Sequence, residues 1–237
     1  MKWFCLLLIT FSPSYVLHIP ALSFFIVWNV GQGQWTTAVT PGACYHFDMG
    51  GEFFPLSKII QQCRYKTNMA FLSHWDWDHV GGLTKIKKKL PMCIALRPLG
   101  PASKKKRKLL AGFKDCPGDT IPLLKRWHPT QFKNANEQSQ VLLFKHVLLP
   151  GDSPSEHEKL WMKESWISQT RFLVLGHHGS NTSSSAELLS ALPSGIQAIS
   201  SARWARYKHP HSSVELRLKQ ARIPILRTED WGNIWIE

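Results

Sequence analysis

The stretch Ser73-His74-Trp75-Asp76-Trp77-Asp78-His79-Val80-Gly81-Gly82 decides how this chain is interpreted. It follows the apolar run Met69-Ala70-Phe71-Leu72, which reads as a buried strand, and it precedes a glycine pair that opens an expected helix. Imidazoles and carboxylates packed this tightly cannot all be buried without a partner, and a divalent metal ion would cancel their negative charge. The alternative is a polar turn whose acids face water. We expect four metal ligands here: His74, Asp76, Asp78 and His79.

Residues of ligand type also follow later apolar runs. Asp152 comes after a strand-like run and a glycine, and His177 and His209 each come at or soon after an expected strand end. Asp152 is well placed to bridge two metal ions, which together would clamp the attacking and leaving oxygens of a phosphodiester. Asp48 stands at a strand end close to Gly50 and Gly51, a favoured place to aim a carboxylate into a site.

Short strands alternate with helices in both halves of the chain. The strands are expected near 23–29, 35–39, 44–48, 69–72, 140–144, 146–149, 171–175, 198–200, 223–227 and 232–236. The helices are expected near 55–63 and 82–90, from 153 to about 166, and after the Ser-x-x-Glu sequences that begin at 184 and 212. Because ligand-type residues sit at strand ends in both halves, we predict an α/β fold with two mixed sheets packed together and helices outside, an αββα sandwich.

The surface charge favours a polyanionic partner. The chain of 237 residues has a formal net charge of +13, which suits nucleic acid or an anionic membrane face. From His79 to Lys114 there is no Asp or Glu, and this basic block directly follows the candidate metal motif. We expect it near the mouth of the site, facing a phosphate backbone; the alternative is a solvated basic loop without a ligand. The expected DNA contacts are Lys104, Lys105, Lys106, Arg107, Lys108 and Lys208.

The N-terminus indicates export. Met1-Lys2 precedes a run of mostly apolar residues and then small and polar ones, the shape of a secretory signal peptide. We therefore divide the chain into a signal peptide or N-terminal anchor at 1–20 and one domain at 21–237, with a basic insertion near 85–114. The expected location is periplasmic or secreted. A buried N-terminal strand is the alternative for this segment, and a cytoplasmic or membrane-associated protein is the alternative for the location.

The cysteines agree with export. Cys5 would leave with a signal peptide, and four cysteines would remain, a number suited to two disulfides in an oxidising compartment. Sequence order suggests the pairs Cys44–Cys63 and Cys93–Cys116. Three pairings are possible for four cysteines, and four buried free thiols are a further alternative.

The pattern His74-x-Asp76-x-Asp78-His79-x-Gly81-Gly82 resembles the metallo-β-lactamase superfamily motif, in the variant carried by the ComEC DNA-uptake proteins. In that variant an aspartate replaces the second histidine of the usual HxHxDH. The resemblance covers roughly residues 23–237, because further matches occur in family order. They are Val30-Gly31-Gln32-Gly33, Asp48-Met49-Gly50, Asn136-x-x-Ser139, Leu149-Pro150-Gly151-Asp152, Gly176-His177-His178-Gly179-Ser180 and Tyr207-Lys208-His209-Pro210-His211.

The resemblance implies an αββα metallo-hydrolase that cleaves DNA phosphodiesters in a DNA-uptake role. It adds Asp152 and His209 to the expected metal ligands, and it makes Asp78 and His177 the expected catalytic residues, His177 as a ligand or as proton donor to the leaving oxygen. Larger members carry this domain beside a membrane channel, so a channel partner is expected, and no organic cofactor is. Residues expected around the ligands are Asp48, Ser73, Asn136, Ser139, His178 and His211, with His178, His211 and Lys208 at the rim.

Departures from the family pattern affect the metal. Asn29 and Gln34 stand where the family turn has more acidic residues, and neither is an expected ligand. The middle histidine of the wider superfamily has no clear equivalent, and Asn136 and Ser139 occupy that region. We therefore expect one or two divalent ions, with Mn²⁺ or Mg²⁺ as credible as Zn²⁺. The alternative functions are hydrolysis of a small ester, lactone or phosphodiester, and non-catalytic binding of DNA or a partner.

Overall fold

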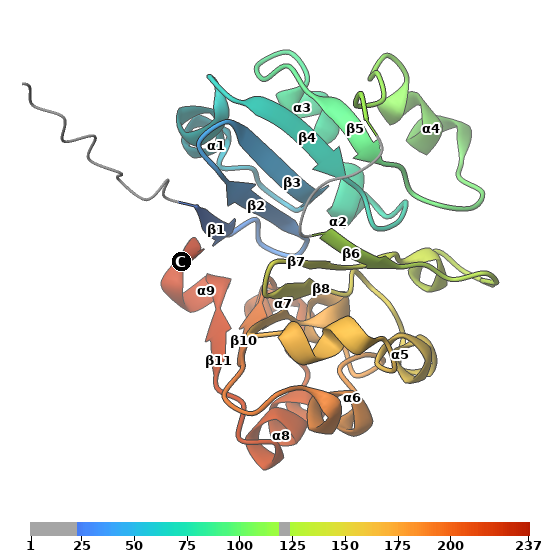
Figure 1. Ribbon diagram of the computed structural model, residues 1–237, viewed down its shortest axis with the longest axis vertical. Coiled ribbons are helices and arrows are strands. Elements are labelled where there is room, and N and C mark those ends of the chain that lie inside the picture. Colours follow the sequence, from blue (N-terminus) through green and yellow to red (C-terminus); the bar gives the residue numbers. More distant parts are fainter. Residues whose placement is uncertain (1–22, 119–123) are drawn as a thin grey trace, which may run out of the picture.

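The computed structural model describes residues 23–118 and 124–237. Over these residues two six-stranded sheets face each other, and helices cover their outer sides (Figure 1). The strand order is β12-β1-β2-β3-β4-β5 in one sheet and β11-β10-β9-β8-β7-β6 in the other. The predicted αββα sandwich is therefore confirmed. The predicted signal peptide lies outside the described residues.

The first sheet carries the opening motif at one edge. Strands β3, β4 and β5 are parallel, so their carboxyl ends meet at that edge. The strands of this sheet are β1 (Phe24–Val27), β2 (Trp35–Val39), β3 (Ala43–Met49), β4 (Thr67–Phe71), β5 (Cys93–Leu96) and β12 (Ile234–Ile236). The helices of this half are α1 (Leu56–Cys63), α2 (Trp77–Val80), α3 (Leu83–Ile86) and α4 (Lys104–Leu110).

The second sheet is parallel from β8 to β11, so its loops also gather at one edge. Its strands are β6 (Leu124–Trp127), β7 (Val141–Phe144), β8 (Val147–Leu149), β9 (Phe172–Val174), β10 (Gln197–Ser200) and β11 (Ile225–Arg227). The helices of this half are α5 (Ser155–Trp161), α6 (Ala186–Ala191), α7 (Trp204–Tyr207), α8 (Ser212–Gln220) and α9 (Thr228–Trp231). Short 3₁₀ helices occur as η1 (Asn136–Gln138), η2 (Ser165–Gln169) and η3 (Gly176–Gly179).

Alternation along the strands builds three apolar layers. In β7, Leu142 and Phe144 join the layer between the sheets, while Val141 and Leu143 join the layer beneath the helices of the second half. Four phenylalanines meet between the sheets with ring centroids 5.1–5.7 Å apart: Phe25, Phe47, Phe71 and Phe144. Each fully buried ring contributes about 1.5–3 kcal/mol relative to exposure, so this layer holds the two sheets together.

The capping predictions were wrong in detail. Helix α5 has Pro154 at its N-cap and no side-chain cap, so Ser153 does not begin it. Helix α6 is capped by Ser185, one residue after the expected Ser184, because Glu158 accepts hydrogen bonds from both of their backbone N–H groups. Helix α8 is capped by the ring of His211, which accepts from the N–H of Ser213.

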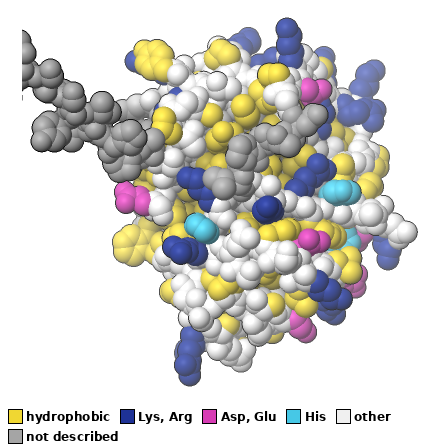
Figure 2. All heavy atoms as spheres, viewed as in Figure 1, with side chains coloured by type: hydrophobic (Ala, Val, Ile, Leu, Met, Phe, Trp, Pro, Cys, Tyr) yellow, Lys and Arg dark blue, Asp and Glu magenta, His cyan; other side chains and the backbone are white. Residues whose placement is uncertain are grey.

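Two helices end earlier than the sequence suggested, and four were not predicted: α2, α4, α7 and α9. Helix α3 ends at Ile86 rather than near 90, and α5 ends at Trp161 before the separate turn η2. Part of the basic block forms α4, whose first turn is capped by Ser103. Figure 2 shows lysine and arginine side chains projecting from the upper right of this face, where α4 lies in Figure 1. Within the described ranges, no helix has the length and apolar character needed to cross a membrane.

Two disulfides fasten the first half of the chain. Cys44–Cys63 joins β3 to the end of α1, and Cys93–Cys116 joins β5 to the segment after α4. The pairing suggested by sequence order is confirmed, and the alternative of free thiols is excluded for these four cysteines.

Removing the Cys44–Cys63 disulfide should destabilise the protein. A cross-link across 19 residues limits the entropy of the unfolded chain, so Cys44→Ala/Cys63→Ala should lower the free energy of unfolding by about 3 kcal/mol. Urea denaturation under oxidising conditions measures this loss, with the wild type in reducing buffer as the reference for losing both bridges. An unchanged midpoint would show that this bridge does not stabilise the fold.

Candidate metal centre

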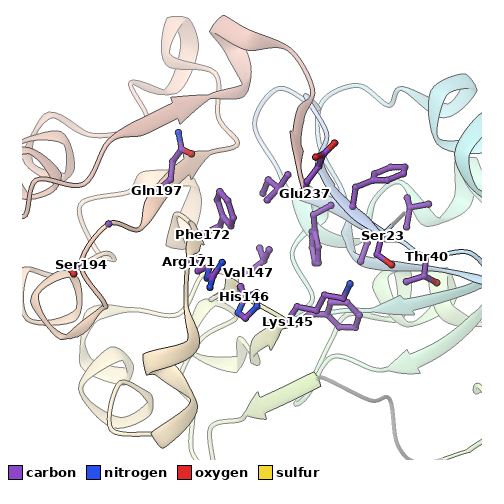
Figure 3. A pocket seen from close by; sticks show the side chains of 17 residues that line it. Ser23, Thr40, Lys145, His146, Val147, Arg171, Phe172, Ser194, Gln197 and Glu237 are labelled. Carbon is purple, nitrogen blue, oxygen red and sulfur yellow. The ribbon is translucent and has the colours of Figure 1, made fainter. Parts of the chain in front are cut away.

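A cavity of about 610 Å³ opens at the edge of the sandwich where β8 and β9 begin (Figure 3). Phe172 and Val147 belong to its apolar wall, and Lys145 and Arg171 contribute cationic groups. None of the predicted site residues lines it. The histidines and aspartates of the motifs lie instead at the opposite edge, where the parallel strands end.

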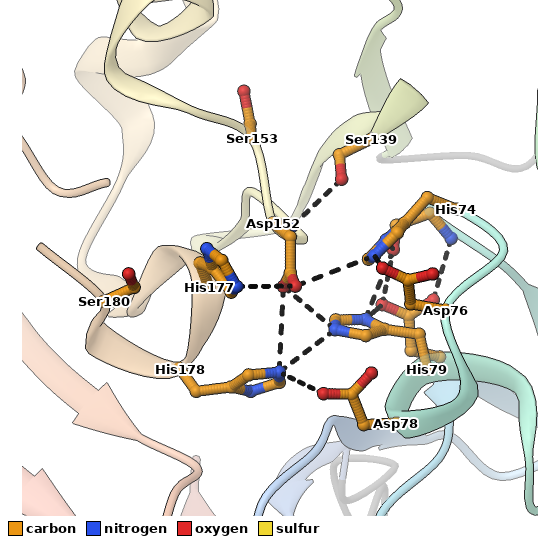
Figure 4. Close-up of polar contacts among 12 residues, drawn as sticks. His74, Asp76, Asp78, His79, Ser139, Asp152, Ser153, His177, His178 and Ser180 are labelled. Atoms are coloured by element: carbon orange, nitrogen blue, oxygen red, sulfur yellow. Dashed lines mark hydrogen bonds and ion pairs between the residues drawn. The ribbon is translucent and has the colours of Figure 1, made fainter. Parts of the chain in front are cut away.

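At that edge the ligand-type side chains converge from both sheets (Figure 4). His74, Asp76, Asp78 and His79 come from the segment after β4, as the sequence predicted. The second sheet contributes Asp152 after β8 and the His177-His178 pair after β9. Gln140 ties the two edges together, because its backbone N–H donates to the Ser73 carbonyl and its amide donates to the Leu72 carbonyl.

Asp48 positions the ligands from behind. Its carboxylate accepts hydrogen bonds from the N–H and the hydroxyl of Ser73, each at 2.7 Å, and lies 2.7 Å from Nδ1 of His79. Ser73 Oγ is also 2.9 Å from Nδ1 of His74. Asp48 has a φ of 52°, a conformation that non-glycine residues adopt rarely and that clusters at functional sites. One carboxylate thus directs both histidine rings so that Nε2 faces the cluster.

The turn after β3 has room only for glycine at position 50. A Cβ atom on Gly50 would lie 2.1 Å from the carbonyl carbon of Asp78, so the turn packs directly on the backbone of α2. This close contact fixes the position of α2 relative to Asp48. It explains why the Asp48-Met49-Gly50 sequence and the opening motif occur together.

His79 and Asp152 form the centre of the cluster. Nε2 of His79 lies 2.9 Å from Oδ1 of Asp152 and 3.2 Å from Nε2 of His178. His178 Nε2 is in turn 3.2 Å from Oδ2 of Asp78. His178 is buried with 1% of its surface exposed, so its expected place at the rim was wrong. Its φ of 57° turns the ring inward, which a periodicity argument could not reveal.

His74 and Asp76 form the second side of the cluster. Nε2 of His74 lies 3.7 Å from Oδ2 of both Asp76 and Asp152. Asp76 also accepts a hydrogen bond from Lys106 of helix α4, with Nζ 2.8 Å from Oδ1. Lys106 was expected to contact DNA directly, and the structure shows it turned into the site instead, paired with a candidate ligand.

The charges of the cluster are strongly coupled. Burial opposes the charged form of His79, yet Asp152 and Asp48 raise its pKa well above the usual value. Burial opposes the ionised form of Asp152 too, yet His79, His178 and His74 hold its pKa well below the usual value. The contact with His74 is the largest of the causes that lower the pKa of Asp76 to about 2, with Lys106 adding to it.

A divalent metal fits these atoms. Among the described residues, Nε2 of His74 is buried with no hydrogen-bond partner. Two sets of three residues place one ligand atom each within 4.8 Å of one another: His74 with His79 and Asp152, and Asp78 with His79 and His178. Imidazole nitrogens and carboxylate oxygens at such spacing suit Zn²⁺ or Mn²⁺, and a cation would take the place of the proton on His79 Nε2.

His177 and His209 lie beside these sets. Nδ1 of His177 is 3.0 Å from the Thr182 hydroxyl, and its Nε2 is 3.6 Å from Oδ2 of Asp152. Burial lowers the pKa of His177 below its usual value, so its ring is neutral at pH 7. Nδ1 of His209 is 3.1 Å from the Gln32 amide, a contact that the sequence did not suggest. Burial, followed by the charge of His178, lowers the pKa of His209 to about 4, which also leaves a neutral ring suited to binding metal.

The remaining predicted residues support the edges of the site. The Ser139 hydroxyl accepts from the N–H of Asp152, and the Asn136 carbonyl accepts from the N–H of Ser139. The ring of the half-buried His211 caps α8, and its backbone N–H donates to the Gly179 carbonyl at the end of η3. On α4, the four basic residues other than Lys106 are exposed: Lys104, Lys105, Arg107 and Lys108.

Comparison with known proteins relates this chain to competence and recombination proteins. The chain is 29% identical to Recombination protein 2 of Haemophilus influenzae, with 87% of this chain and 28% of that protein covered. It is 28% identical to competence protein ComA of Neisseria gonorrhoeae (86% and 30%) and to ComE operon protein 3 of Bacillus subtilis (69% and 24%). The chain is therefore similar to ComEC-type competence proteins. The chain spans less than a third of the length of each of these relatives.

Solved structures support the metallo-β-lactamase fold of this chain. A metal-dependent hydrolase of the β-lactamase superfamily matches with a TM-score of 0.59 at 13% identity, covering 91% of this chain and 99% of that one. The metallo-β-lactamase fold protein YhfI from Bacillus subtilis matches with a TM-score of 0.56 at 10% identity, covering 90% and 98%. No family model matches the sequence.

Adding metal should stabilise the folded protein. Mn²⁺ or Zn²⁺ at a hundred times its dissociation constant adds about 2.7 kcal/mol, which corresponds to a rise in Tm of about 5–10 °C. Asp152→Asn should remove most of this rise in differential scanning fluorimetry. The exposed Asp115, paired with Arg97, offers a matched control in Asp115→Asn, which should keep it. An equal rise in Asp152→Asn would contradict the ligand assignment.

Asp48→Ala should weaken metal binding without removing any proposed ligand. The loss of its contacts to Ser73 and His79 frees the His79 ring, so the dissociation constant of the metal should rise by about 10- to 100-fold. Isothermal titration of the metal-free protein measures this constant. Unaltered affinity would show that His79 does not depend on Asp48.

Proposed function

We propose that this domain is a metal-dependent hydrolase that cleaves DNA phosphodiesters. The observation that carries the proposal is the contact between Lys106 and Asp76, because it joins the basic helix α4 directly to the edge of the metal cluster. A substrate that binds here meets a row of cations and the candidate metal ligands at the same place. A nucleic-acid strand carries one negative charge on each phosphate, so it complements these cations along its whole length.

The proposed reaction divides its tasks among the residues of the site. His74, His79 and Asp152 would hold one divalent ion, and Asp78 and His178 would contribute to a second. Nε2 of His79 is its one ring nitrogen not engaged by Asp48, so it can bind just one of the two ions. The metal, when bound, supplies Lewis-acid activation of water and neutralises charge on the phosphate. Lys106 adds positive charge at the same mouth and balances Asp76.

His177 is suited to a proton transfer. With the proton on Nδ1 donated to the Thr182 hydroxyl, the neutral ring presents the lone pair of Nε2 to the cluster near Asp152. The proposed role is to take a proton there from the attacking water and to pass it to the leaving oxygen of the phosphodiester. Thr182 keeps the ring in the orientation that this transfer needs, since its own hydroxyl is held by Ser180.

The net charge and the relatives support DNA as the substrate. A charge of +13 attracts a polyanion strongly, whereas a small lactone or ester gains little from it. Two relatives are named for competence or recombination, and recombination acts on DNA. By the same inference, the domain would act in DNA uptake with a membrane channel as partner. The two disulfides support a proposed exported location, because such bridges persist in oxidising compartments.

Asp78→Ala should abolish cleavage and keep DNA binding. With linear DNA and a series of Mn²⁺, Mg²⁺ and Zn²⁺, the loss in rate should be on the order of 100-fold or more, because a proposed ligand is removed. Binding should stay salt-dependent, since the phosphate contacts come from lysines and arginines. Asp115→Ala is the matched control and should cleave at the wild-type rate.

Two outcomes would overturn the proposal. If no metal supports cleavage while salt-sensitive binding persists, the domain binds DNA without hydrolysing it. If a lactone or nitrophenyl ester is turned over and DNA is not, the substrate is a small molecule. Full activity in Asp78→Ala would refute the role of that carboxylate.

A further inference from the structure

Two exposed tryptophans stand in chain segments that lead to residues of the metal cluster, and each has a lysine over its ring. Trp77, the first residue of α2, exposes 42% of its surface, and Nζ of Lys105 lies 5.0 Å from its ring centroid. Trp204, the first residue of α7, exposes 47%, and Nζ of Lys208 lies 3.9 Å from its ring centroid. The core of this protein accommodates other tryptophans, since Trp28, Trp35 and Trp161 are fully buried. The exposure of Trp77 and Trp204 therefore does not follow from their size.

Both tryptophans belong to segments that supply the site. Trp77 stands between Asp76 and Asp78 in the chain, and both carboxylates face the cluster. Trp204 is followed, after one turn of helix and Lys208, by His209, whose ring centroid lies 6.3 Å from that of His177. One tryptophan therefore comes from each half of the sandwich. A strand of nucleic acid that crosses the cluster would pass from one half to the other.

The backbone under both rings is fixed. Helix α2 packs on the turn at Gly50 with no room for a Cβ atom, as described above. Helix α7 is held by the Glu52 carboxylate, which pairs with Arg203 and Arg206 and accepts from the N–H of Gln32. Gln32 in turn contacts His209. Rings on such rigid supports lose little freedom when a flat ligand stacks on them.

We propose that Trp77 and Trp204 are stacking platforms for bases of single-stranded nucleic acid, one on each side of the metal cluster. This proposal rests on the proposed function and narrows its substrate to strands with unpaired bases. Every base offers a flat face to an aromatic ring whatever its sequence, and a basic groove with aromatic rings is how such strands are bound without sequence preference. Bases in a duplex are already stacked on their neighbours, so they cannot use these rings.

The lysines over the rings fit the same ligand. An exposed cation–π contact is weaker than the stacking of a base, so an arriving base displaces the ammonium group. The displaced Lys105 and Lys208 then find phosphates, which carry one charge per nucleotide, within reach of their flexible side chains. Each tryptophan–lysine pair thus matches one nucleotide, the ring to its base and the ammonium to its phosphate.

Binding of labelled DNA to the full chain tests the platforms separately from catalysis. Fluorescence anisotropy in EDTA, where no cleavage occurs, compares three ligands of about 12 nucleotides, within the range of single-strand site sizes: oligothymidylate, an abasic strand with the same phosphates, and a duplex. Trp77→Leu and Trp204→Leu should each raise the Kd for oligothymidylate by about tenfold. Their Kd values for the abasic strand and the duplex should change less than about twofold.

Matched variants separate stacking from charge and from folding. Tyr65 is 85% exposed with Arg64 over its ring at 4.4 Å, and it precedes β4, whose far end leads to the cluster. Tyr65→Leu should therefore bind all three ligands like the wild type. Lys105→Ala should raise the Kd for all three ligands by a similar factor, since it removes charge alone. Trp77→Phe and Trp204→Phe should restore most of the binding because a flat ring remains.

The platforms would be refuted by unchanged oligothymidylate binding in both leucine variants, or by an equal loss for the abasic strand. Either result leaves the cleavage assay untouched. Conversely, if the wild type cleaves no DNA with any metal but binds oligothymidylate through its tryptophans, the platforms stand and the hydrolase proposal fails.

Discussion

The carboxylate of Asp48 is the contact on which the arrangement of the site depends. It joins the end of β3 to the start of the motif after β4 through Ser73, and to α2 through His79. The carboxylate is buried, so its charge has to be balanced by hydrogen bonds and by the His79 ring. These contacts stabilise the left-handed backbone conformation at Asp48 and the close packing at Gly50. The histidine orientation that the cluster needs is therefore a consequence of where one carboxylate is buried.

Much of the fold could be predicted from local pattern. The apolar runs predicted ten strands, because both faces of each sheet are covered and buried strands read as continuous apolar runs. Strands β5 and β6 were not predicted, and β6 has no buried residue. The disulfide pairing followed from sequence order. Helix ends were less predictable, since the caps at Ser185 and His211 depend on tertiary contacts with Glu158 and with the turn at Gly179. A Ser-x-x-Glu sequence shows that a cap could form, and the packing decides which residue forms it.

The candidate site was predictable as a set of residues, and less so as an arrangement. The cluster at 74–79 and Asp152 were expected together because they follow strands whose ends meet. The inward turn of His178 depends on two consecutive left-handed residues, and spacing gives no signal for that conformation. The contact of Lys106 with Asp76 was hidden as well, because a run of five basic residues looks uniform until a helix gives each side chain its own direction.

The Cys93–Cys116 bridge has a consequence for the basic helix. The segment between these cysteines, 23 residues apart, contains α4, so the helix lies inside a covalently closed loop. A closed loop restricts how far its contents can travel, which keeps the ammonium groups at a high effective concentration beside Asp76. The positive charge of this domain therefore behaves as part of the wall of the site. An untethered basic tail with the same composition would share its charge between the site and bulk solvent.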